Sequence, residues 1–130
     1  MGWWQRLVGS TPRVQPVSVN DDNFRSEVLR SELPVLVDFW SDGCAPCRQL
    51  ESVILGLAAT YEGRVKVCEA NTAGVPRVGV RYEIMATPTV LYFHKGQLVE
   101  RVVGFRGSLY HRELIDGELL APPAPGPPGT

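Results

Sequence analysis

The sequence predicts an α/β fold, a single domain with a central mixed β-sheet flanked by helices on both faces. Three observations carry this prediction. Strand-like and helix-like segments alternate over residues 14–120. The run PVLVDFW, at 34–40, is almost unbroken in β-favouring residues, which is typical of a strand buried on both sides. A chain of 130 residues, 44% of them hydrophobic, is long enough for one core and too short for two ordinary domains.

The first half of the chain is predicted to run strand, helix, strand, helix. The apolar segment VQPVSV, at 14–19, is the first strand. Asn20 can cap the following helix, because its side-chain oxygen can accept hydrogen bonds from the N–H groups of the first turn. The run at 34–40 is the second strand. A long helix then begins at the cysteines, since apolar residues recur along one side at helical spacing: Cys47, Leu50, Ile54, Leu57 and Tyr61.

The second half adds three more strands and two more helices. RVKVCEA, at 64–70, is predicted as a strand, and 71–80 as a short irregular helix and loop. TVLYF, at 89–93, and LVERVV, at 98–103, form a hairpin whose turn is HKGQ. The amphipathic pattern of 108–120 predicts a closing helix.

Two short segments are expected to flank this domain. We assign 1–13 as an N-terminal lead, 14–120 as the domain, and 121–130 as a disordered tail, because its five Pro and two Gly residues cannot bury a core. Trp3 and Trp4 could touch a membrane surface or a partner, but packing on their own domain is the favoured interpretation.

The composition argues against several classes of function. With 13 basic and 14 acidic residues the net charge is −1, which offers no basic excess for nucleic acid or an anionic membrane. No segment approaches the ~20 apolar residues of a membrane span, and the start of the chain lacks the pattern of a signal peptide. Three cysteines do not make the disulfide framework of a secreted domain. We therefore expect a cytoplasmic protein, and we expect it to be a monomer.

The pair Cys44 and Cys47 admits three interpretations: a metal clamp, a structural disulfide or a catalyst. Structural zinc usually takes two close pairs of ligands, and the second pair is missing, because Cys68 and the two histidines are scattered singly. A structural disulfide between residues three apart would remove little entropy from the unfolded chain. Redox chemistry is what so short a link suits.

The position of the pair at a strand-to-helix turn favours the redox interpretation. A thiolate at a helix N-terminus faces unpaired N–H groups and the positive end of the helix dipole, so the pKa of Cys44 should fall. One turn later Cys47 should point toward the core, close enough to attack Cys44 once that residue is joined to a substrate sulfur. Pro46 restrains the loop between them.

Asp38 is the third candidate for the chemistry. It shares a face of the predicted central strand with Leu36 and Trp40, so its carboxyl should be buried and its pKa raised. We interpret it as a proton acceptor for Cys47, with a strand aspartate that reaches solvent as the alternative.

Several motifs carry a family resemblance. VLVDFW, the CAPC pair, YEIMATPTVLYF and the late glycine of VVGF match, in order and spacing, the motifs of thioredoxins, so that 14–120 resembles the thioredoxin family and its fold. The resemblance implies that Cys44 is the nucleophile, Cys47 the resolving thiol and Asp38 the buried proton acceptor. It also implies that Pro88 is a cis-proline opposite the pair.

The resemblance further implies a rim that meets the substrate, where the backbone of Thr87 pairs with an extended peptide. Thioredoxins usually carry Trp at the position of Gly43, and Met85 and Phe105 flank the same rim, where they could restore apolar contact or pack inward. Glu69 stands where thioredoxins usually have Lys near the buried Asp. The expected rim residues are Trp40, Gly43, Ala86, Thr87, Pro88 and Gly104.

The predicted function is reduction of protein disulfides through a Cys44–Cys47 dithiol/disulfide cycle, with no cofactor or metal beyond this pair. The resemblance implies disulfide-containing protein substrates and an electron donor resembling thioredoxin reductase as partners. Two alternatives remain open: a disulfide isomerase or oxidase on the same fold, and a redox-silent binding module. Retention of both cysteines, Asp38 and Pro88 argues against the silent module.

Overall fold

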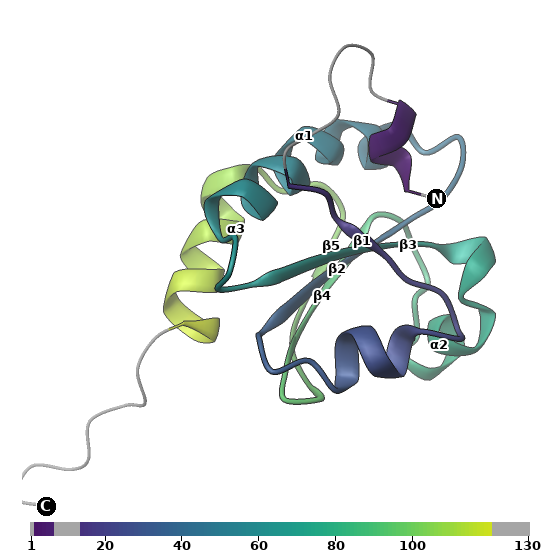
Figure 1. Cartoon of the computed structure of the whole chain (residues 1–130). Coiled ribbons are helices and arrows are strands. Elements are labelled where there is room, and N and C mark those ends of the chain that lie inside the picture. Colours follow the sequence, from purple (N-terminus) through teal and green to yellow (C-terminus); the bar gives the residue numbers. More distant parts are fainter. Residues whose placement is uncertain (1, 7–13, 121–130) are drawn as a thin grey trace, which may run out of the picture.

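A five-stranded mixed sheet forms the centre of the protein, in a computed structural model that describes residues 2–6 and 14–120. The strand order is β1-β3-β2-β4-β5 (Figure 1). Strands β1, β3 and β2 run parallel, whereas β4 is antiparallel to β2 and β5 to β4. The strands are β1 (Val17–Ser18), β2 (Val35–Trp40), β3 (Lys66–Asn71), β4 (Thr89–His94) and β5 (Gln97–Val103).

Helices cover both faces of this sheet, which confirms the predicted fold class. Helices α1 and α3 lie on one face, and α2 lies on the other together with the helical segment η2 (Figure 1). The predicted closing helix is divided into α3 and a π-helical turn, η4. The helices are α1 (Ala45–Thr60), α2 (Pro76–Arg81) and α3 (Ser108–Leu114), with short segments η1 (Trp3–Arg6), η2 (Arg25–Leu29), η3 (Thr72–Gly74) and η4 (Ile115–Leu119).

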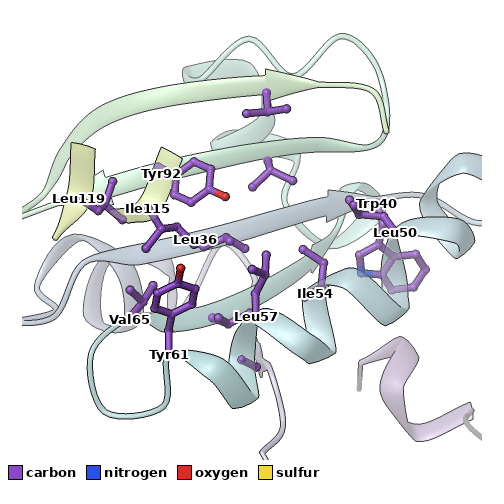
Figure 2. Packing of buried hydrophobic residues seen from close by; sticks show 14 of the residues in the cluster. Leu36, Trp40, Leu50, Ile54, Leu57, Tyr61, Val65, Tyr92, Ile115 and Leu119 are labelled. Carbon is purple, nitrogen blue, oxygen red and sulfur yellow. The ribbon is translucent and has the colours of Figure 1, made fainter. Parts of the chain in front are cut away.

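Strand β2 divides the apolar interior into two cores because its side chains alternate between the two faces of the sheet. Leu36 and Trp40 belong to the core beneath α1, which Figure 2 shows, and Val37 and Phe39 belong to the core on the opposite face. All six residues of β2 are buried, as the unbroken apolar run predicts. Asp38 lies two positions from both Leu36 and Trp40, so it shares their face of the strand, which is the α1 side.

A helix cap and a hairpin turn form as the sequence predicts. The side-chain oxygen of Asn20 accepts hydrogen bonds from the N–H groups of Asp22 (2.9 Å) and Asn23 (3.0 Å), so Asn20 caps the short helical segment that leads into η2. The β4–β5 hairpin turns at Lys95 and Gly96, whose φ angles are 51° and 78°. Two successive positive φ angles match the right-handed twist of the flanking strands.

A buried histidine makes the stability of the fold depend on pH. His111 is fully buried, and its Nδ1 shares a 2.6 Å hydrogen bond with the hydroxyl of Tyr92. Burial lowers the pKa of His111 from 6.5 to about 4. Between these two pH values the unfolded chain binds a proton that the folded protein excludes, so this residue destabilises the fold as the pH falls.

We expect the free energy of unfolding of the wild type, relative to that of His111→Gln, to fall by up to about 3 kcal/mol between pH 6.5 and 4. Glutamine keeps a polar partner for Tyr92 but does not titrate in this range. Urea unfolding of both proteins across the range measures the difference. A difference that does not change with pH would show that His111 titrates normally in the folded state.

Candidate active site

Cys44 occupies the N-cap of α1, where the sequence predicts an activated thiol. Its Sγ accepts a hydrogen bond from the backbone N–H of Cys47 (3.2 Å). Cys44 is half-buried, and the neighbouring Ala45 and Pro46 are exposed. An N–H donor at this sulfur and the helix dipole both favour the thiolate of the reduced protein.

Cys47 lies three residues after Cys44, in the first turn of α1, and its side chain points toward the core. It is 3% exposed and belongs to the core that contains Leu36 and Trp40. The two cysteines form a disulfide with a Cα–Cα distance of 5.2 Å. The pair therefore has one sulfur that a partner can approach from solvent and one that the core shields.

The loop before β4 faces this disulfide. The Thr87–Pro88 peptide bond is cis, as the resemblance implies, and the carbonyl oxygen of Thr87 lies 3.6 Å from Sγ of Cys44. The hydroxyls of Thr87 and Ser41 are hydrogen-bonded at 2.7 Å. The N–H of Gly104 donates to the carbonyl of Pro88 (2.8 Å), which ties the end of β5 to this loop.

Asp38 is a buried carboxyl on the α1 side of the sheet. It is 1% exposed, and neither of its oxygens has a full hydrogen bond with any described residue. Burial, together with the negative charges of Glu69 and Glu51, raises the pKa of Asp38 to about 8, although the indole N–H of Trp3 acts in the opposite direction. The alternative of a solvent-reaching aspartate is wrong.

Glu69 is buried beside Asp38 in the adjacent strand, where the two residues are register partners of β3 and β2. It is 2% exposed, and its carboxylate accepts hydrogen bonds from Nε1 of Trp40 (2.6 Å) and from the hydroxyl of Ser18. Glu69 therefore does not face water. Trp40 thus connects the strand that carries Asp38 to the second carboxylate.

The position of Glu69 gives a prediction for Asp38. Glu69→Gln keeps a side-chain oxygen as acceptor for Trp40 but removes the negative charge, so the pKa of Asp38 should fall. A pH titration of the Asp38 carboxyl ¹³C resonance in the oxidised protein measures this. Glu62→Gln, on the exposed surface, is the matched control. Equal Asp38 midpoints in wild type and Glu69→Gln would show that the charge of Glu69 does not act on Asp38.

The rim around Cys44 is open and partly apolar. Gly43 is exposed and has a φ of +72°, a conformation that disfavours any larger residue, so the tryptophan usual in thioredoxins would be strained here. Met85 is 90% exposed and Phe105 is 44% exposed, so both point outward. Ala86 is exposed as well.

The described residues outside this site offer neither a second reactive thiol nor a cluster of metal ligands. Cys68 is a fully buried free thiol whose pKa burial raises to about 12, as expected of an inert cysteine. No group of three or more metal-binding side chains occurs in the ranges 2–6 and 14–120. Over the same ranges no helix is long and apolar enough to cross a membrane.

The residue that the sequence did not assign is Trp3. It is 1% exposed and packs in the core beneath α1 with Trp40 and Cys47, which confirms inward packing. No spacing rule links a tryptophan near the chain start to an aspartate 35 positions later, so only its burial-prone side chain hinted at this contact.

Comparison with known proteins agrees with this geometry. The thioredoxin family profile matches residues 15–115. Thioredoxin 1 of Nostoc and a thioredoxin of Synechocystis are each 46% identical over 86 residues, which is 66% of this chain and 80% of theirs. A chloroplastic M-type thioredoxin of Spinacia oleracea is 42% identical over 86 residues, which is 66% of this chain and 48% of that protein. With its Cys44–Cys47 disulfide, the chain belongs to the thioredoxin family of thiol–disulfide oxidoreductases.

Proposed function

We propose that the protein reduces protein disulfides, with Cys44 as the attacking thiolate, Cys47 as the resolving thiol and Asp38 as the proton acceptor of Cys47. The observation that carries this proposal is the asymmetry of the pair: Cys44 is half-buried at a helix N-cap, whereas Cys47 is shielded in the core. Pro46, in the first turn of α1, restrains the loop that joins the two sulfurs.

The electrons and protons balance in two steps. The Cys44 thiolate attacks one sulfur of the substrate disulfide, which forms a mixed disulfide and releases the other substrate sulfur as a thiolate. Asp38 accepts the proton of Cys47, whose thiolate then attacks Sγ of Cys44 and releases the second substrate sulfur. Two electrons pass from the protein dithiol to the substrate, and the protein is left with its Cys44–Cys47 disulfide.

The carboxyl of Asp38 suits this proton transfer. A general acid or base is most effective when its pKa is near the working pH. Burial and two neighbouring negative charges bring the pKa of Asp38 to about 8. An aspartate at its ordinary pKa would be a much weaker base toward a thiol.

The substrate would bind over the rim of Cys44. The carbonyl of Thr87 faces Cys44 and can accept a backbone hydrogen bond from an extended peptide. Met85, next to Ala86 in the chain, also lines an apolar hollow with Val80 and Ile84. The proposed rim comprises Gly43, Ala86, Thr87 and Gly104, with Pro88 and Trp40 buried behind them.

The wider setting follows from the family. Disulfide-containing proteins are the proposed substrates, and a reductase of the kind that serves thioredoxins is the proposed electron donor, with the cysteine pair as the sole redox group. We propose that the protein acts as a monomer in the cytoplasm, without nucleic-acid or membrane partners. The similar proteins named above include cyanobacterial thioredoxins and a chloroplastic one, so they do not decide between compartments. The proposed location rests on the composition of the sequence alone.

The test is catalytic reduction of a disulfide-containing protein with a small dithiol as donor. We expect multiple turnovers by wild type, and loss of two titratable thiols per molecule when the reduced protein is oxidised by substrate. A redox-silent binding module would show neither. A measured reduction potential near those of oxidases or isomerases, rather than near that of thioredoxin, would favour the isomerase or oxidase.

A further inference from the structure

The N-terminal segment η1 packs directly against the two buried carboxyls. Trp3 is 1% exposed, its indole N–H and both carboxyl oxygens of Asp38 are buried without a hydrogen-bond partner among the described residues, and the indole N–H lowers the pKa of Asp38. Gly2 is buried beside Glu69, because a Cβ placed on Gly2 would lie 2.5 Å from Oε2 of Glu69. Figure 1 shows this segment lying next to α1.

The side chains around Asp38 act on its charge in two opposite directions. Glu69 from β3 and Glu51 from α1 both disfavour the carboxylate, and β4 presents the apolar Val90 as register partner. The Trp3 indole is the one neighbour, among the described residues that act on Asp38, that favours the charged form. It also has no other hydrogen-bond partner among those residues.

We propose that Trp3 is a positioning residue of the active site, whose indole N–H stabilises the carboxylate of Asp38 while the segment Gly2–Trp4 closes the carboxyl pair to water. This inference rests on the proposed role of Asp38. It concerns residues that precede the matched family region, 15–115, so the family match does not supply it. The physical basis is that a buried carboxylate needs a donor, and that an indole N–H can only donate.

The two functions of Trp3 act in opposite directions and can be separated by two variants. Trp3→Phe keeps most of the apolar cover but removes the donor, so the Asp38 midpoint should shift upward. Trp3→Ala removes the cover as well, so water should reach Asp38 and the midpoint should shift downward. Tyr82→Phe removes a polar group from an aromatic side chain that packs against the core on the opposite face of the sheet, and it should leave the midpoint unchanged.

The midpoint is read from the Asp38 carboxyl ¹³C resonance of the oxidised protein, without substrate. The rate at which Cys47 resolves a mixed disulfide should follow it, because each unit of upward shift lowers the carboxylate fraction about tenfold at pH values below the midpoint. A purely structural role predicts that both Trp3 variants shift the midpoint the same way. That result, or unchanged midpoints, would overturn the proposal.

A measurement on the wild type covers the case in which a Trp3 variant does not fold. The indole N–H resonance of Trp3 should titrate with the same midpoint as Asp38, and it should not titrate over this range in Asp38→Asn. An indole resonance that ignores the Asp38 titration would overturn the proposal. If the resonance follows Asp38 but Asp38→Asn resolves mixed disulfides normally, the Trp3 contact stands and the catalytic role of Asp38 fails.

Discussion

Replacing Cys44 by serine should lower multiple-turnover disulfide reduction by more than about a thousandfold. The serine hydroxyl does not ionise near neutral pH, so the N–H group at the N-cap has no anion to stabilise. The other thiols cannot substitute, because Cys47 and Cys68 are 3% and 0% exposed. The measurement is steady-state reduction of a disulfide-containing protein with excess dithiol.

The matched control for this loss is Cys68→Ala. It also removes one thiol from the chain, but from a buried site that the proposed chemistry does not use. We expect it to retain wild-type turnover. Normal multiple turnover by Cys44→Ser would remove Cys44 from the mechanism, and inactivity of both variants would show that the assay reports on folding.

Replacing Asp38 by asparagine should stabilise the oxidised protein by an amount that grows with pH. The folded pKa is raised, so Asp38 contributes stability below its unfolded pKa of about 4, and this contribution is lost as the pH rises through about 8. Relative to its value at pH 4, the advantage of Asp38→Asn should reach roughly 5 kcal/mol above pH 8. Chemical unfolding of both oxidised proteins from pH 4 to 9 measures it.

The same variant should be slower in catalysis, because asparagine cannot accept the proton of Cys47. Greater stability at high pH together with slower resolution of the mixed disulfide is what a buried functional carboxyl predicts. The pH dependence of the stability that Asp38 contributes has the opposite sign to that of His111, and of these two residues only Asp38 contributes a pH dependence between pH 6.5 and 8. An advantage of Asp38→Asn that is independent of pH would show that Asp38 ionises normally in the folded protein.

The sequence predicted the elements whose pattern extends over many residues. The apolar run of β2 and the helical spacing of α1 identified both elements, and the junction between them located Cys44 and Cys47. Strand alternation placed Asp38 on the same face as Leu36 and Trp40, because the period of a strand decides which face a side chain occupies. These local patterns are strong enough to survive in the tertiary structure.

Contacts between distant segments could not be predicted in this way. The alternation of β3 does not show that Glu69 is held by Trp40, since that bond depends on how two strands pair. The packing of Trp3 against the core is a contact with residues far along the chain, and no periodic pattern in the sequence predicts such a contact. The positive φ of Gly43 is likewise set by the turn between β2 and α1, whereas the sequence showed only a missing tryptophan.

The most direct test of the proposed mechanism is the intermediate that Cys47→Ser accumulates. With its resolving thiol removed, the reduced variant should stop after one attack, and intact mass measurement should show one substrate joined through Cys44. Wild type should show no such adduct at steady state, and Cys44→Ser should form none. An adduct joined through Cys47, or sustained turnover by Cys47→Ser without an adduct, would contradict the assignment of the two sulfurs.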